Sequence, residues 1–161
     1  MGRNFFIGIA EWKIASSPDK LLCSALGSCV GVCLYDRRRL VCGVVHVLLP
    51  LSGMFPLQNN PPKFADQGVE FLIKQMERHG SARRDLTAKI VGGAALFEFK
   101  HKTMLANIGT RNVETVKSEL QRLNIPITAE DTGDVYGRSV IFDPANGDLH
   151  VRALKGGNKV I

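Results

Sequence analysis

The sequence lacks the features that would place the chain in a membrane, secreted or repetitive class of protein. No apolar run approaches the ~18 residues that cross a bilayer, so no membrane insertion is expected. Residues 1–6 contain neither the apolar core of a signal peptide nor the Ser or Thr of a myristoylation signal at position 6. No internal repeat is present. We therefore expect a cytoplasmic protein with a single domain over residues 1–161.

Aromatic residues are few, at 7%, and acidic residues are outnumbered by basic ones, 15 against 21, which gives a formal charge of +6. This charge permits a nucleic acid, an anionic membrane surface or an acidic protein as partner. Aromatic and basic residues are not interleaved, so nucleic-acid binding is not expected. The basic groups at 37–39, 83–84 and 100–102 are interpreted as solvated loops, or as a surface that attracts an acidic helical partner.

Cysteine is scarce, but its four copies lie within 20 residues, at Cys23, Cys29, Cys33 and Cys42. Disulfides are disfavoured in a reducing cytoplasm. A zinc site usually has two pairs of ligands, and the spacing of Cys29 and Cys33 fits one pair. A clear second pair is missing, although Cys42 and His46 lie in the same predicted hairpin, so a site made of two Cys and one His remains an alternative. Free cysteines often act as small buried hydrophobes, which is the interpretation favoured for Cys33 and Cys42.

The apolar pattern predicts more strands than helices. Two amphipathic helices are predicted at 63–79 and 113–123, the second with Asn112 as its N-cap. Strands are predicted at 5–10, 21–26, 30–35, 40–49, 87–91, 125–130, 138–142 and 149–154. Because strands and helices do not alternate regularly, the α+β class is favoured over a doubly wound sheet.

Cys29 differs from the other cysteines in its setting. It follows Gly27-Ser28 at a tight corner, where glycine allows close approach of a substrate and leaves backbone N–H groups as donors. A thiol needs a nearby base to act as a nucleophile. His46 is a candidate, because it lies in an apolar run in the other arm of a predicted hairpin; a histidine packed in the core is the alternative.

The length of the hairpin loop decides whether Cys29 and His46 can meet. If Asp36 pairs with Arg39, Cys29 lies directly opposite His46, with Cβ atoms roughly 4.5–5.5 Å apart. A four-residue loop places Gly31 opposite His46 and makes Cys29 a diagonal neighbour on the same face. A three-residue loop would put the two side chains on opposite faces.

Seven segments, taken in order, resemble one known family. They are 26–36 (LGSCVGVCLYD), 46–50 (HVLLP), 63–66 (KFAD), 89–97 (KIVGGAALF), 107–112 (NIGTRN), 129–133 (AEDTG) and 137–140 (GRSV). Together they are similar to the signature of CheD, the chemoreceptor glutamine deamidase family, over nearly the whole chain.

The resemblance implies an enzyme that hydrolyses selected glutamine side chains of methyl-accepting chemotaxis receptors to glutamate and ammonia. It implies packed, sandwich-like β-sheets flanked by two main helices, as in a bacterial toxin deamidase. The CheC phosphatase is a further implied partner, and the chemistry needs no metal or cofactor. The alternative is a catalytically weak or inactive module that docks on receptors or on CheC.

The resemblance also implies roles for three residues. Cys29 is the expected nucleophile and His46 the expected base. The family usually places a catalytic threonine six residues before the cysteine, where this chain has Cys23. A thiol is a weaker hydrogen-bond partner than a hydroxyl, so the third role is expected to be weakened.

Further candidates line a predicted substrate or oxyanion loop. Gly27-Ser28 adjoin the nucleophile, and Gly92-Gly93 are interpreted either as part of this loop or as a tight strand end. Arg111 is a candidate substrate contact. Thr132 is interpreted as lining the site or as part of a turn.

Overall fold

Ten strands and two α-helices make up the regular framework of residues 1–96 and 107–161, the part of the chain that this computed structural model describes. One sheet has the order β1 (Asn4–Ile7), β3 (Lys20–Leu26), β8 (Arg138–Asp143), β9 (Asp148–Ala153), β10 (Gly157–Val160). The other has the order β2 (Trp12–Ser16), β5 (Val41–Val47), β4 (Val30–Asp36), β6 (Leu86–Gly92), β7 (Ile127–Thr132). The helices are α1 (Ala65–Arg78) and α2 (Ile108–Arg122).

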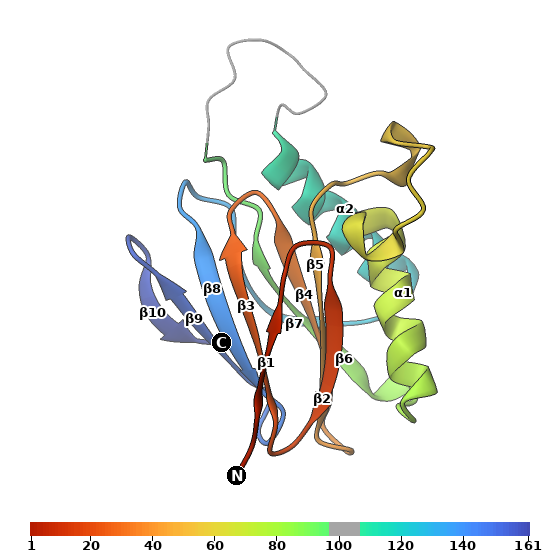
Figure 1. Ribbon diagram of the computed structural model, residues 1–161, viewed down its shortest axis with the longest axis vertical. Helices are drawn as coiled ribbons and strands as arrows, with labels where there is room; N and C mark the ends of the chain where they lie inside the picture. Colours follow the sequence, from red (N-terminus) through yellow and green to blue (C-terminus); the bar gives the residue numbers. More distant parts are fainter. Residues whose placement is uncertain (97–106) are drawn as a thin grey trace.

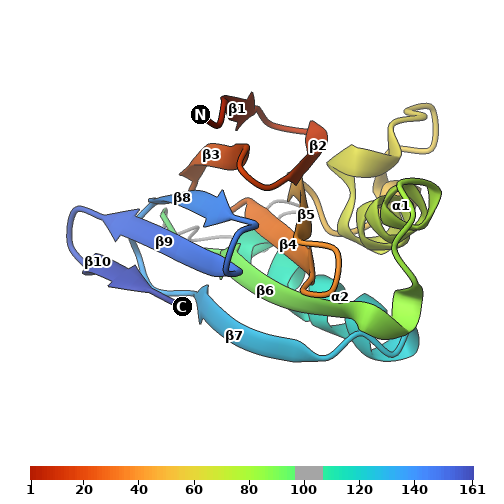
Figure 2. The ribbon, with the colours of Figure 1, turned by 90° about the horizontal axis from the view of Figure 1, so that it is seen from below.

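The two sheets pack face to face, and both helices cover the outer face of the second sheet (Figures 1 and 2). The central strands β4 and β5 are buried at all seven positions each, because one face meets the other sheet and the opposite face meets the helices. The predicted α+β class with packed sheets and two main helices is confirmed. Short 3₁₀ turns lie at Ser52–Met54, Pro61–Lys63 and Arg83–Asp85.

Some predicted elements differ from those observed. Strands β2 and β10 were not predicted, since both are short and β10 is wholly exposed. Helix α2 begins at Ile108, five residues before the predicted start. The prediction of Asn112 as its N-cap is wrong: Asn107 caps the helix in a left-handed conformation (φ 56°), and Asn112 is a buried residue inside it.

The β4–β5 hairpin has the four-residue loop, with Asp36 paired to Val41. Gly31 therefore lies opposite His46, and Cys29 precedes the strand as a diagonal neighbour on the same face. Two of the three loop lengths considered from the sequence keep these side chains on one face, and the structure has the longer of the two, the four-residue loop.

All four cysteines lie in the layer between the sheets, and none is part of a disulfide. Cys33 and Cys42 are fully buried among apolar side chains, as expected for small packing residues. Phe97 of the KIVGGAALF segment and the basic group at 100–102 lie outside the described residues. No helix of the described chain is long and apolar enough to cross a membrane.

Candidate active site

Cys29 lies at the end of a bend, residues 27–29, that connects β3 of one sheet to β4 of the other. The segment after β6 holds this bend by two backbone hydrogen bonds: Ala94 N–H donates to the Gly27 carbonyl at 2.8 Å, and Gly93 N–H donates to the Cys29 carbonyl at 2.8 Å. Only 5% of Cys29 is exposed. The nucleophile expected from the sequence therefore sits just below the surface, on a backbone fixed by β6.

His46 projects from β5 into the layer between the sheets and is completely buried. Gly31 lies opposite it on β4, and the side chain of Leu26 packs over this glycine. The ring reaches the other sheet, where Nδ1 lies 3.3 Å from Sγ of Cys23 on β3. Cys23, His46 and the bend at Cys29 are thus brought together by three strands of two sheets.

The second ring nitrogen of His46, Nε2, is buried and has no hydrogen-bond partner among the described residues. The backbone N–H of Cys29 faces the residue's own sulfur. One ring nitrogen of His46 therefore remains available as a base, on the face of the hairpin that the register assigns to Cys29 as well.

Burial determines the protonation of these groups at rest. It lowers the pKa of His46 from 6.5 to about 4. It raises the pKa of the Cys29 thiol, an effect that the residue's own backbone N–H partly opposes. It also raises the pKa of Cys23 to about 12, with a further contribution from nearby Cys29. At neutral pH the site holds neutral thiols and a neutral imidazole.

The lowered pKa of His46 predicts that stability falls in mild acid. The folded-state pKa of about 4 lies below the ordinary value of 6.5, so this contribution is complete above pH 6.5 and is lost as the pH falls toward 4. By pH 5 the free energy of unfolding should fall by about 2 kcal/mol from this group alone. Urea unfolding at pH 7 and pH 5 measures this difference. His46→Gln should show a flatter dependence, and an equal loss in the variant would contradict the assignment.

Gly92 and Gly93 permit the close packing of β6 against the bend and against α2. Gly92 has a φ of 116°, and a Cβ there would overlap the carbonyl oxygen of Cys29. Gly93 has a φ of 69°, and a Cβ there would overlap the Val113 side chain. A tight strand end accounts for both glycines, and their position beside Cys29 keeps them candidates for the substrate loop.

The two remaining candidates for the substrate loop, Thr132 and Arg111, lie on other elements than Cys29 and His46. Thr132 ends β7, paired with Gly92 on β6, so it is one strand removed from the bend. Arg111 lies on α2 and contacts the sulfur of Met54 at 3.6 Å.

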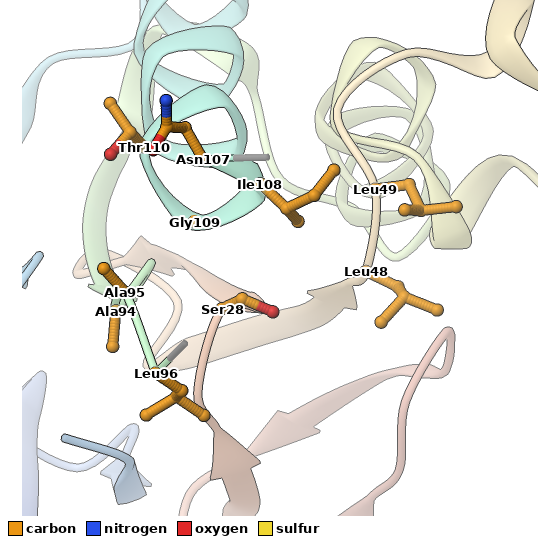
Figure 3. Close-up of a pocket in the computed structure, with 10 residues that line it drawn as sticks. All are labelled: Ser28, Leu48, Leu49, Ala94, Ala95, Leu96, Asn107, Ile108, Gly109 and Thr110. Atoms are coloured by element: carbon orange, nitrogen blue, oxygen red, sulfur yellow. The ribbon is translucent and has the colours of Figure 1, made fainter. Parts of the chain in front are cut away.

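A cavity of about 350 Å³ opens beside Ser28, directly next to the nucleophile in the chain (Figure 3). Apolar side chains from three segments form much of its wall, among them Leu48, Leu96 and Ile108. The first turn of α2 and the residues that follow β5 lie on its far sides (Figure 3). The sequence did not predict this cavity, because its walls come together only through the fold.

Sequence reasoning also missed two buried polar side chains near the site. Asn112 on α2 bonds the backbone on either side of the reacting pair. Arg138, whose side chain is fully buried, pairs with Asp131 and donates to the carbonyl of Gly133 in the loop after β7. Their segments, NIGTRN and GRSV, were recognised, but Asn112 was predicted only as a helix cap and Arg138 was given no role. No three His, Cys, Asp or Glu side chains in the described ranges converge so as to hold a metal ion.

The fold and sequence were compared with known proteins. The chain is similar to a solved structure of the Bacillus licheniformis hypothetical protein YfiH, with a TM-score of 0.47 and 14% identity over 77% of this chain. It spans about half (49%) of that structure's length.

Sequence relatives match over almost their full length. A Methanosarcina acetivorans protein named "Probable chemoreceptor glutamine deamidase CheD 1" is 44% identical over 96% of this chain and 95% of its own. Proteins named "Probable chemoreceptor glutamine deamidase CheD" from Syntrophomonas wolfei and Clostridium botulinum are each 41% identical, over 100% and 96% of both chains. Residues 48–153 match the family described as "CheD chemotactic sensory transduction". These matches show that the chain belongs to the CheD family.

Proposed function

We propose that this protein hydrolyses the side-chain amides of selected glutamines on methyl-accepting chemotaxis receptors, with Cys29 as the nucleophile. Family membership and the printed names of the relatives support the receptor as substrate. One observation carries the assignment of the chemistry. His46 is buried on the face of the hairpin that the register gives to Cys29 as a diagonal neighbour, with Nδ1 at Cys23 and Nε2 unpartnered among the described residues.

The first half of the reaction forms a thioester. His46 Nε2 takes the proton of the Cys29 thiol as the sulfur attacks the glutamine Cδ. Negative charge develops on the amide oxygen, and the backbone N–H of Cys29 is the donor nearest in the chain to the reacting sulfur. When the tetrahedral intermediate collapses, the C–N bond breaks and His46 returns the proton to the leaving nitrogen, which departs as ammonia.

The second half regenerates the enzyme. A water molecule gives a proton to His46 and attacks the thioester carbon, and collapse breaks the C–S bond. The proton returns to the Cys29 sulfur, and the receptor side chain leaves as glutamate. The sum is one amide and one water converted to one carboxylate and one ammonium ion, since the ammonia takes up the proton that the new carboxyl group releases; no oxidation state changes.

Burial keeps the catalytic pair neutral until a substrate arrives. Since burial raises the pKa of Cys29 and lowers that of His46, a free thiolate–imidazolium pair does not persist. Proton transfer is therefore expected to accompany attack on the substrate carbonyl.

Cys23 fills the third role with weaker chemistry than a threonine would provide. For Nε2 to act as base, the neutral ring must carry its proton on Nδ1, 3.3 Å from the Cys23 sulfur; the Ile7 carbonyl is a further acceptor for the ring. Its pKa of about 12 keeps Cys23 protonated, so it is a weak, uncharged acceptor. Cys23 thus orients the imidazole without drawing a proton from it.

The partners follow from this activity. We infer that the protein works in the cytoplasm on receptor signalling regions, and that the CheC phosphatase is a second partner. Family membership supports both inferences. The excess of basic residues, 21 against 15 acidic ones, is compatible with an acidic receptor surface.

Conversion of receptor glutamines tests the function directly. The purified protein, incubated with the cytoplasmic fragment of a receptor from its own cell, should convert a defined subset of glutamines to glutamate, read peptide by peptide by mass spectrometry. A fragment incubated alone controls for spontaneous deamidation. Binding without conversion would contradict the enzyme and favour the docking module.

A further inference from the structure

One buried side chain outside the reacting groups touches the backbone beside each of them. Asn112 lies in the second turn of α2 and is completely buried. Its Nδ2 donates to the Ser28 carbonyl at 2.9 Å and to the Leu48 carbonyl at 3.0 Å. Ser28 directly precedes Cys29, and Leu48 follows His46 by two residues. A single amide therefore joins the approach to the nucleophile to the end of the strand that carries the base.

The position of this amide relative to the hairpin gives it a specific task. The β4–β5 ladder ends at the pair Val30–Val47. Continuing that register by one step places Cys29 opposite Leu48, where the backbone N–H of Leu48 bonds Lys63 instead of β4. Asn112 connects the two chains just past the last ladder pair, at the level of the nucleophile.

The first hydrogen bond also fixes the direction of a donor. The Ser28 carbonyl and the Cys29 N–H belong to one planar trans peptide unit, so they point in opposite directions. Because Asn112 holds the carbonyl toward α2, the Cys29 N–H points away from α2. This N–H is the donor proposed for the oxyanion, and such donors act only when they are fixed in advance.

The two hydrogen bonds determine how the amide of Asn112 is oriented. Two carbonyl acceptors determine that Nδ2 faces the strands, since the amide oxygen would repel both. The oxygen, Oδ1, is then buried and has no partner in the described part of the chain. An apolar side chain of similar size would remove this unpaired acceptor, but it would leave the carbonyls of Ser28 and Leu48 without their donor.

We propose that Asn112 is a positioning residue, which fixes the spacing of Cys29 and His46 and the direction of the Cys29 N–H. The proposal rests on the function proposed above, because it names the residue that holds that function's catalytic groups in place.

The test compares Asn112→Leu and Asn112→Asp with Val116→Ala. Val116 is fully buried one turn further along α2 and contacts the helix side of the core, so its truncation loosens α2 packing without removing either hydrogen bond. Both Asn112 variants should lose about 100-fold in kcat, the size of effect seen when an oxyanion donor is misplaced. KM should change less than about two-fold, since no substrate contact is removed. Val116→Ala should keep kcat near wild type while lowering the melting temperature.

A second readout needs no receptor. Alkylation of Cys29 by iodoacetamide at pH 7, mapped by peptide mass, should slow about ten-fold in the Asn112 variants and not in Val116→Ala, because the thiol loses its aligned base. Unchanged alkylation, or an equal loss of kcat in Val116→Ala, would overturn the positioning role. If the wild type converts no glutamine while alkylation still depends on Asn112, the positioning role stands and the proposed function fails.

Discussion

Cys29→Ala is expected to abolish the conversion of receptor glutamines, with a loss of about 10⁴-fold or more in rate, because it removes the thiol that we propose forms the thioester. The remaining donors and the cavity beside Ser28 would still bind the substrate, so affinity for the receptor fragment should change little. Glutamine conversion followed by peptide mass, together with binding measured on the same fragment, separates the two effects.

Cys42→Ala is the matched control for that substitution. Cys42 is fully buried in the same layer between the sheets but lies on β5, away from the bend that carries Cys29. This variant should lose stability by about 1 kcal/mol and keep its activity. Activity that survives in Cys29→Ala and disappears in Cys42→Ala would show that the nucleophile has been assigned to the wrong cysteine.

His46→Gln is expected to lower kcat about 10³-fold, the range expected when a general base and acid is removed. The pH profile should change as well. In the wild type the neutral pair is present from about pH 5 upward, because the pKa of His46 is lowered to about 4 and that of Cys29 is raised. In the variant the thiolate must form by loss of its proton to solvent, so the residual rate should rise with pH through pH 8 and 9.

Steady-state rates from pH 5 to pH 9 measure this change for both proteins. Circular dichroism at each pH confirms that the variant remains folded, which matters because His46 is completely buried. A variant within ten-fold of the wild type, with the same flat profile, would mean that His46 is a core histidine without a catalytic role.

The sequence predicted the reacting pair because the relevant contacts are local. Cys29 and His46 lie 17 positions apart on the two arms of one hairpin, where the spacing restricts the pairing to a few registers. It could not choose between the two registers that put both on one face, because Asp36-Arg37-Arg38-Arg39 suits loops of more than one length. The structure shows the four-residue loop, with Gly31 opposite His46.

The remaining parts of the site depend on contacts between distant segments. The Cys23 sulfur reaches His46 only because β3 and β5 belong to different sheets that pack face to face. Asn112 was predicted as a helix cap from its local sequence, whereas packing of Gly109 against Gly93 allows α2 to start earlier and buries Asn112 in the site. Neither contact leaves a periodic or spacing signal in the sequence.

The central claim is that Cys29 forms a thioester with a receptor glutamine, and an acid-quenched reaction tests it most directly. Wild-type protein mixed with the receptor fragment, quenched in acid within the first turnover and digested, should yield a Cys29 peptide joined to a receptor peptide, with the mass of one ammonia lost. The adduct should be absent in Cys29→Ala and should disappear on treatment with hydroxylamine, which cleaves thioesters. Two results would contradict this claim. One is conversion of glutamines without the adduct, together with full activity of Cys29→Ala. The other is an adduct on Cys23, Cys33 or Cys42.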